Sequence, residues 1–209
     1  SGVLLDHSDL QGQLVQGYDF ISSASNAKDG DGRDADPNDV GDAASAGDCG
    51  WGRPDADTES SWHGTHVAGT IAAASNNGIG VAGVAWGVKI LPARALGKCG
   101  GYSTIKTDAM RWSAGLSVAG VPANANPAKI LNMSLGGYGS CSTTYQEAIN
   151  DVVNVGATVM VAAGNSDSNA ANFNPASCDN IVSIAATKRD GGRAEYSNYG
   201  SVVDVAAPG

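Results

Sequence analysis

The strongest constraint on the fold is an alternation of short apolar runs with stretches of helical periodicity. The apolar runs predict strands at 88–96, 130–135, 158–163, 181–186 and 202–206. Helical patterns predict helices at 66–73, 104–117 and 145–155, and the second places Ile105, Ala109, Trp112 and Leu116 on one face. Such alternation is typical of a parallel sheet that is covered on both faces. We therefore predict an α/β fold, with a doubly wound, mostly parallel sheet and helices on both faces, as a single domain over residues 1–209.

The charge distribution argues against two classes of partner. The net charge is −9, and ten of the 21 acidic residues lie between Asp29 and Glu59, where only Arg33 and Arg53 offset them. An acidic chain without a stripe of Lys and Arg is a poor binder of nucleic acid or of an anionic membrane surface. No run of apolar residues is long enough to span a bilayer. We expect no nucleic-acid partner and no membrane partner.

Four cysteines, at positions 49, 99, 141 and 178, are widely spaced and form no Cys-x-x-Cys pair. An even number of such cysteines indicates disulfides and hence an oxidising, extracellular location. Four cysteines allow three pairings, and four buried free thiols are the alternative.

The segment 62–70 holds the most informative polar residues. His63 follows a polar loop at the start of a predicted helix, where an imidazole can exchange protons, and His66 lies one turn further on. A metal pair is one interpretation, but the zinc motif needs a spacing of four residues with an adjacent glutamate. A packed, hydrogen-bonded histidine is the other alternative.

Four blocks of sequence, in order along the chain, together resemble the subtilisin-like serine peptidases, or subtilases. They are the histidine block at 63–70, the substrate-pocket strand at 132–137, the oxyanion block at 162–165, and the stretch from 196 to 209 that leads toward the serine block. The cysteines and the acidic insertion resemble those of the secreted Gram-negative bacterial branch. The resemblance covers nearly the whole chain.

The resemblance implies a role for several residues. His63 would be the general base, and Asn165 would donate a hydrogen bond to the oxyanion. Ser134, Leu135 and Gly136 would line the pocket for the substrate side chain, while Gly100 and Gly101 would offer an open strand edge. Without the resemblance, Asn165 would be interpreted as a turn residue, and the two glycines as a plain turn.

The implied function is that of a secreted endopeptidase, which acts on a protein or peptide substrate through an acyl-enzyme. It would be made with a propeptide and act as a monomer. The family's Asp-Ser/Thr-Gly and Gly-Thr-Ser-Met-Ala motifs are not in the chain, which we expect to be incomplete at both ends. The alternatives are a non-catalytic binding module of the same fold, an inactive fragment, and a calcium-dependent structural or adhesive domain.

Two loops are candidates for structural Ca²⁺. Carboxylates crowd the segment 29–42, and hard oxygen ligands on a flexible loop suit this ion; the predicted ligands are Asp31, Asp34, Asp36 and Asp39. The segment resembles an EF-hand loop only at its start, because the glutamate expected at the twelfth position is absent. A solvated acidic loop is the alternative. The segment 76–81 resembles the family's calcium loop, although the spacing after His63 is one residue longer. There the resemblance implies ligation by Asp9, by the side-chain oxygen of Asn77, and by the backbone carbonyls of Ser75, Ile79 and Val81.

With the resemblance in place, we expect the disulfides Cys49–Cys99 and Cys141–Cys178. The first would tie the acidic segment to the substrate strand, and the second would brace the loops beyond the pocket. Asn174–Pro175 lies where the family has a cis proline, whereas a trans bond is the general expectation.

Overall fold

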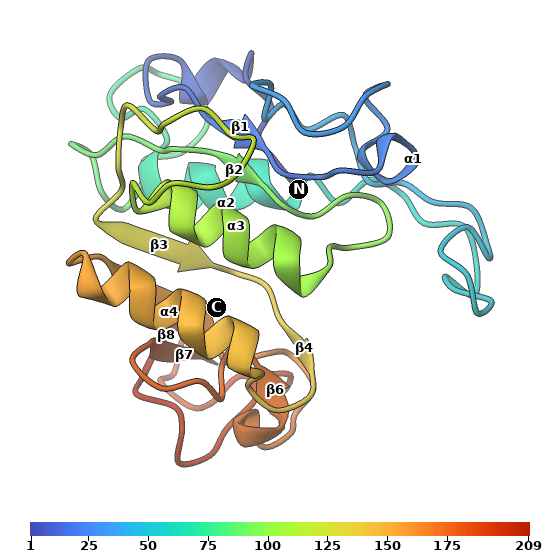
Figure 1. The fold of residues 1–209 in the computed structure, drawn as a ribbon. Helices are drawn as coiled ribbons and strands as arrows, with labels where there is room; N and C mark the ends of the chain where they lie inside the picture. Colours follow the sequence, from blue (N-terminus) through green and yellow to red (C-terminus); the bar gives the residue numbers. More distant parts are fainter. The chain divides into compact units, whose positions relative to one another are not determined.

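The computed structural model describes all residues, 1–209. The chain divides into two compact units, Ser1–Ala109 and Met110–Gly209. The division falls within helix α3 (Ser103–Ser113), which is labelled in Figure 1. Each unit is described by itself, and the single domain remains a prediction. None of the helices is both long enough and apolar enough to cross a membrane.

The first unit has little regular structure, and its longest helix other than α3 is α2 (His63–Ala72). Its short elements are η1 (Ser8–Leu10), β1 (Tyr18–Asp19), α1 (Ala24–Ala27) and β2 (Ala93–Arg94). Strands β1 and β2 pair in parallel. A small core of Val3, Leu10 and Ala68 joins the first residues of the chain to α2.

A buried ion pair fastens the acidic segment to β2. Arg94 is 2% exposed and contacts two carboxylates, those of Asp19 and Asp29, as well as the carbonyl oxygen of Ala27. Burial raises the pKa of Asp19 to about 6, against the effect of Arg94, which favours the charged form. Removing one member of such a pair would leave the other charge buried and uncompensated.

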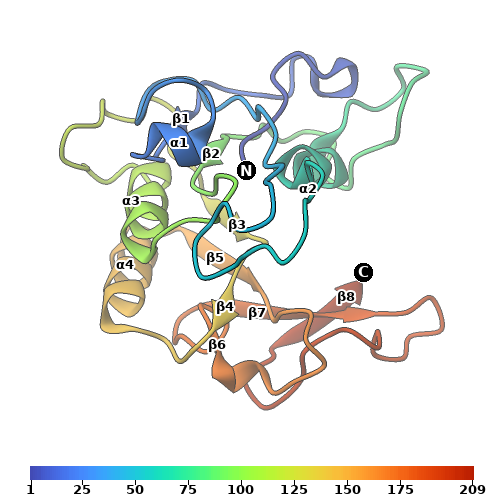
Figure 2. The same cartoon turned by 90° about the vertical axis from the view of Figure 1, so that its right-hand side faces the viewer.

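The second unit is built on a parallel sheet with the strand order β3-β5-β7-β8 (Figure 2). These strands are β3 (Ile130–Met133), β5 (Thr158–Ala162), β7 (Val182–Thr187) and β8 (Val205–Pro208). Strand β4 (Gly137–Tyr138) pairs antiparallel with β6 (Phe173–Asn174), which directly follows the 3-10 helix η2 (Ala170–Asn172). The predicted mostly parallel α/β fold is confirmed.

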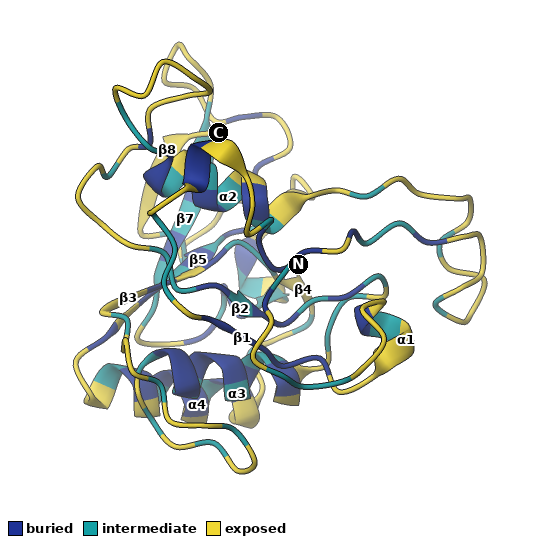
Figure 3. Ribbon diagram, turned by 90° about the horizontal axis from the view of Figure 1, so that it is seen from above, coloured by how far each residue is buried: buried dark blue, intermediate teal, exposed yellow.

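Helix α4 (Thr143–Asn154) packs on this sheet through one apolar face. Figure 3 shows buried and exposed residues alternating along this helix. Its buried residues, Tyr145, Ala148, Ile149 and Val152, have the spacing of a single helical stripe. They join Leu131, Val159 and Val161 of the sheet in the main core of this unit. The helix begins at Ser142, whose Oγ accepts a hydrogen bond from the N–H of Tyr145.

Two predicted elements are much longer than the observed ones; the strands predicted at 130–135 and 158–163 end one or two residues earlier, and the strand predicted at 202–206 begins only at Val205. The strand predicted at 88–96 is only Ala93–Arg94, because Pro92 has no N–H to donate to a ladder. The helix predicted to reach residue 117 ends at Ser113. Gly115 takes a left-handed conformation (φ 91°) that ends the helix. Its N–H donates to the carbonyl oxygen of Trp112, and the N–H of Leu116 donates to that of Arg111.

Both predicted disulfides, Cys49–Cys99 and Cys141–Cys178, are confirmed, and no cysteine is free. The peptide bond Asn174–Pro175 is cis, as in the family pattern, and Arg53–Pro54 is a second, unpredicted cis bond.

Replacing both Cys141 and Cys178 by serine should lower the free energy of unfolding by about 2–4 kcal/mol. The disulfide joins residues with a sequence separation of 37 and so restricts the unfolded chain. Without it the unfolded chain has a higher conformational entropy and is favoured. Urea denaturation measures the difference. As a control, a reductant should shift the double variant less than the wild type, since one of its two disulfides is already gone. A double variant with the wild-type midpoint would contradict this expectation.

Candidate active site

His63 is the first residue of α2 and is exposed to solvent. Its backbone N–H donates to Ser61 Oγ at 3.3 Å. Ser61 is held in turn by Asp42, whose carboxylate accepts from its N–H at 2.6 Å and from its hydroxyl at 2.7 Å. Burial acts to raise the pKa of Asp42, but these two hydrogen bonds lower it below its ordinary value. An ionised residue of the acidic segment therefore positions the start of the histidine helix, a role that the sequence analysis missed.

The first residues of the chain also contact this helix. Ser1 Oγ accepts a hydrogen bond from Gly64 N and donates one to Asp39 Oδ2, both at 2.9 Å. The N–H of Leu4 donates to Thr65 Oγ1 at 2.9 Å. Asp39 is thus a buried acceptor that connects the acidic segment to α2 through Ser1.

The imidazole of His63 is suited to act as a base near neutral pH. Although the residue is exposed, the protein around its ring partly removes water from it, and this desolvation is the largest cause of a pKa below the ordinary value of 6.5. The lowered pKa favours the neutral ring, which is able to accept a proton.

Asn165 lies in the second unit, three residues after the end of β5, and its side chain is exposed. Gly164, just before it, has a φ of 110°, a left-handed conformation that glycine adopts without strain. The carboxyl ends of parallel strands are where functional groups gather in open α/β sheets. Asn165 occupies this position with its amide free to meet a ligand.

The predicted pocket residues Ser134, Leu135 and Gly136 directly follow β3, the strand next to β5. They and Asn165 therefore leave the same end of the sheet. Residues 134–136 lie in no helix or strand, and their backbone groups make no hydrogen bond to the backbone of another residue. Their N–H and C=O groups remain open to an extended peptide, as β-strand addition requires.

Gly100 does not provide the expected open strand edge. Its N–H donates to Gly97 O at 2.9 Å, and its carbonyl oxygen accepts from Gly97 N at 3.1 Å and from Asn26 Nδ2 at 2.9 Å. The local structure is a closed turn beside the Cys49–Cys99 disulfide, with Gly101 directly after it. The turn interpretation of Gly100 is the one that the structure supports.

The predicted ligands in the acidic segment do not gather around a metal ion. Asp34 and Asp36 each accept a hydrogen bond from the backbone N–H two residues further on, at 2.9 and 3.0 Å. Asp39 binds Ser1 and Gly41 N, and Asp31 is exposed. No group of three or more His, Cys, Asp or Glu side chains in residues 1–209 could hold a metal. These four aspartates do not fit a calcium site.

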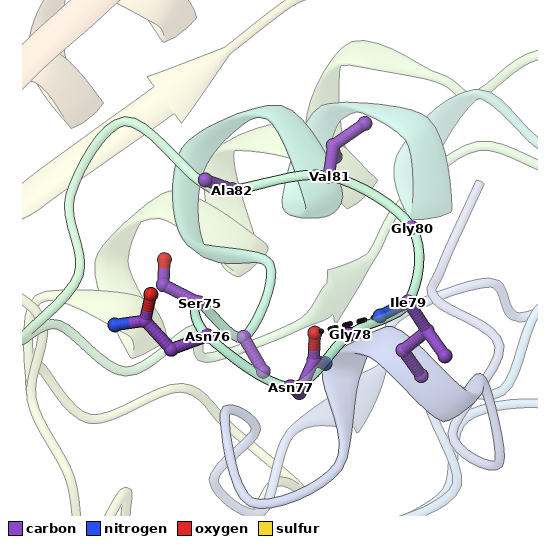
Figure 4. Close-up of a pocket in the computed structure, with 9 residues that line it drawn as sticks. Ser75, Asn76, Asn77, Gly78, Ile79, Gly80, Val81 and Ala82 are labelled. Atoms are coloured by element: carbon purple, nitrogen blue, oxygen red, sulfur yellow. Dashed lines mark hydrogen bonds between the residues drawn. The ribbon is translucent and has the colours of Figure 1, made fainter.

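The second predicted calcium loop curves around an open pocket at residues 74–82 (Figure 4). Asp9 is 4% exposed; its Oδ1 accepts from Asn77 Nδ2 at 2.7 Å, and its Oδ2 accepts from Val81 N at 2.9 Å. Asn77 Oδ1 accepts from Ile79 N at 3.2 Å, drawn as a dashed line in Figure 4. The hydrogen bond from Asn77, followed by that from Val81, lowers the pKa of Asp9.

The ligands implied for this loop are all oxygens, which are the ligands that Ca²⁺ takes. In this structure the Asp9 carboxylate and the Asn77 amide oxygen accept hydrogen bonds from N–H groups of the protein. Ser75 Oγ is a buried oxygen without a hydrogen-bond partner. The loop is closed by protein hydrogen bonds to Asp9.

Replacing Asn77 by alanine should lower the melting temperature in excess EDTA as well as in millimolar calcium. The change removes the hydrogen bond to Asp9, and that bond does not depend on a metal. Thermal denaturation of the wild type and the variant in both buffers measures the effect. If chelation abolished the difference between the two proteins, Asn77 would be acting through a bound ion.

The parallel sheet, the histidine helix and the Gly-Asn loop after β5 define the subtilisin-like class of α/β proteins. The chain belongs to the subtilase family, whose model matches residues 1–209.

Relatives of known name agree with this assignment. An extracellular protease of Xanthomonas campestris pv. campestris is 55% identical over 206 residues, which are 99% of this chain and 35% of the relative. An extracellular basic protease of Dichelobacter nodosus is 56% identical over 209 residues, which are 99% of this chain and 34% of the relative. The chain thus spans about a third of the length of these curated relatives. A solved protease structure from Pseudoalteromonas arctica matches with a TM-score of 0.96 and 54% identity, over 100% of this chain and 60% of that one.

Proposed function

We propose that the chain forms part of a secreted serine endopeptidase that hydrolyses internal peptide bonds of protein substrates through an acyl-enzyme. The observation that carries this proposal is the arrangement at one end of the parallel sheet. There the exposed amide of Asn165 and the open backbone of residues 134–136 follow neighbouring strands. An extended peptide that pairs with residues 134–136 would have its carbonyl group near a fixed donor.

The residues of this chain would act at two points in the reaction. His63 would take the proton of the nucleophile and then give it to the leaving amine, tasks that suit a neutral imidazole with a lowered pKa. Asn165 would donate its amide N–H to the oxyanion of the tetrahedral intermediate. The family's nucleophilic serine and orienting aspartate belong to motifs that residues 1–209 do not contain. The proposed activity is therefore that of the whole protein to which this chain would belong.

Secretion is proposed from the extracellular relatives and agrees with the two disulfides. A propeptide and a monomeric state are proposed from the family resemblance alone. Subtilases generally bind structural calcium. We propose that the loop at residues 75–81, with Asp9, would hold it, because its implied ligands are all oxygens. The four aspartates of the acidic segment do not gather around an ion.

Incubation of the purified protein with a denatured protein substrate tests the proposed activity. We expect new peptides cut at internal bonds, detected by mass spectrometry, and inhibition by a serine-directed sulfonyl fluoride but not by a brief exposure to chelator. Release of terminal residues only, or inhibition by the chelator alone, would refute the proposal.

A further inference from the structure

We propose that Asn198 is a positioning residue that fixes the backbone on both sides of Asn165 and so aims its amide at the substrate. Asn198 is fully buried (0% exposed) in the loop between β7 and β8. This inference rests on the proposed function, in which Asn165 is the oxyanion donor.

The hydrogen bonds of Asn198 surround Asn165 in the sequence. Before Asn165, Asn198 Nδ2 donates to Ala163 O at 2.9 Å, and its backbone N–H donates to Gly164 O at 2.8 Å. After Asn165, Asn198 Oδ1 accepts from Ser166 N at 2.9 Å and from Ser168 N at 3.1 Å. One buried side chain therefore makes hydrogen bonds to the backbone on either side of Asn165 and leaves the Asn165 amide free.

The fit between Asn198 and this loop is tight. A Cβ atom placed on Gly164 would lie 2.3 Å from Asn198 Nδ2, so the backbone passes directly against the amide. Because two acceptor positions and one donor position of the amide are satisfied and the side chain is fully buried, rotation of the side chain would leave several buried groups unpaired. The bonds thus define one orientation of the loop.

The neighbouring segments reinforce this arrangement. Tyr199 N donates to Ser168 O at 3.0 Å, and Asp167 N donates to Tyr196 O at 2.9 Å. Arg193 pairs with Asp167 at 2.7 Å and stacks over the ring of Tyr199. These contacts lie outside residues 163–166, so Asn198 is the side chain that acts on the part of the loop next to Asn165.

The test compares Asn198→Ala and the nearly isosteric Asn198→Asp with the matched control Asn124→Ala. Asn124 also makes three amide hydrogen bonds, but to Trp112, Ser113 and Asn126, outside the oxyanion loop. We measure kcat and KM of the whole protein with a peptide substrate, at a temperature below every melting transition. Removal of the three side-chain bonds should lower kcat by about 10–100-fold, with KM within about 2-fold, because misplacement of a catalytic donor weakens transition-state binding. The control should lower the melting temperature and leave kcat unchanged.

A second measurement does not depend on activity. Amide hydrogen exchange at Ser166 and Ser168 should become faster in both Asn198 variants than in Asn124→Ala. An active wild type with unchanged kcat in both Asn198 variants would overturn the proposal, as would unchanged exchange at these two amides. An inactive wild type that shows the expected exchange would refute the proposed function while supporting the positioning of the loop by Asn198.

Discussion

Replacing His63 by alanine should reduce kcat by about 10⁶-fold, the scale that removal of the general base has in subtilisin, another member of this family. Without the imidazole, no group of the chain at this position can accept the nucleophile's proton in the transition state. Steady-state kinetics with a peptide substrate, supported by active-site titration, measure the loss.

His66→Ala is the matched control for this variant. His66 is exposed and lies one turn further along the same helix, so its loss removes an imidazole from α2 without removing the proposed base. We expect activity close to that of the wild type. Equal losses in the two variants would point to damage of the helix and would contradict the assignment of His63.

The pH dependence provides a second readout for His63. Because burial lowers the pKa of its imidazole, the neutral, active form persists below the ordinary value of 6.5. The acidic limb of kcat/KM should be governed by one proton, and in a variant whose orienting aspartate is replaced by alanine its midpoint should lie below pH 6.5. A midpoint above 6.5 in that variant would contradict the lowered pKa.

Replacing Asn165 by alanine should reduce kcat by about 10²–10³-fold, or about 2.7–4 kcal/mol, a range known from subtilisin itself. The oxyanion exists only in the tetrahedral intermediate and the transition states around it. Loss of its donor should therefore affect kcat and leave KM almost unchanged. Initial rates over a range of substrate concentrations separate the two constants.

Asn169→Ala controls for damage to the loop that carries Asn165. Asn169 is also an exposed asparagine of this loop, and its Oδ1 caps the short helix η2 by accepting from Ala171 N at 3.0 Å. Its replacement should leave kcat unchanged. A rise in KM without a fall in kcat for Asn165→Ala would assign that residue to ground-state binding instead.

The sequence was sufficient to predict the sheet strands of the second unit and helix α4. Their apolar patterns are continuous, and packing in the core enforces them; the stripe from Tyr145 to Val152 is an example. The positions of His63 and Asn165 at the ends of elements were predicted for the same reason, because each follows from a strand or helix boundary.

The acidic segment was not interpreted correctly from its composition. Its charge suggested a cation, but the structure satisfies these carboxylates with backbone N–H groups, with Ser61 and with Arg94. Arg94 and Asp19 are 75 residues apart in the sequence. No local sequence pattern predicts such a contact. The number of charges also does not distinguish a metal site from turns in which aspartates accept hydrogen bonds from backbone N–H groups.

Asn198 was missed because a buried asparagine has no sequence signature. Its function depends on four backbone groups around Asn165, at least 30 residues away, and these groups can be of any residue type. The same reasoning applies to Asp42, whose bonds to Ser61 position the start of the histidine helix.

The most direct test of the central claim is covalent labelling of the whole protein with a fluorophosphonate, followed by intact-mass measurement and peptide mapping. The proposed mechanism predicts one label per molecule, attached to a serine, and almost no labelling in His63→Ala, because the reagent requires an activated nucleophile. Absence of labelling in the folded wild type would contradict the claim that this subtilase is a serine peptidase. Equal rates of labelling in the wild type and in His63→Ala would contradict the role of His63 as its base.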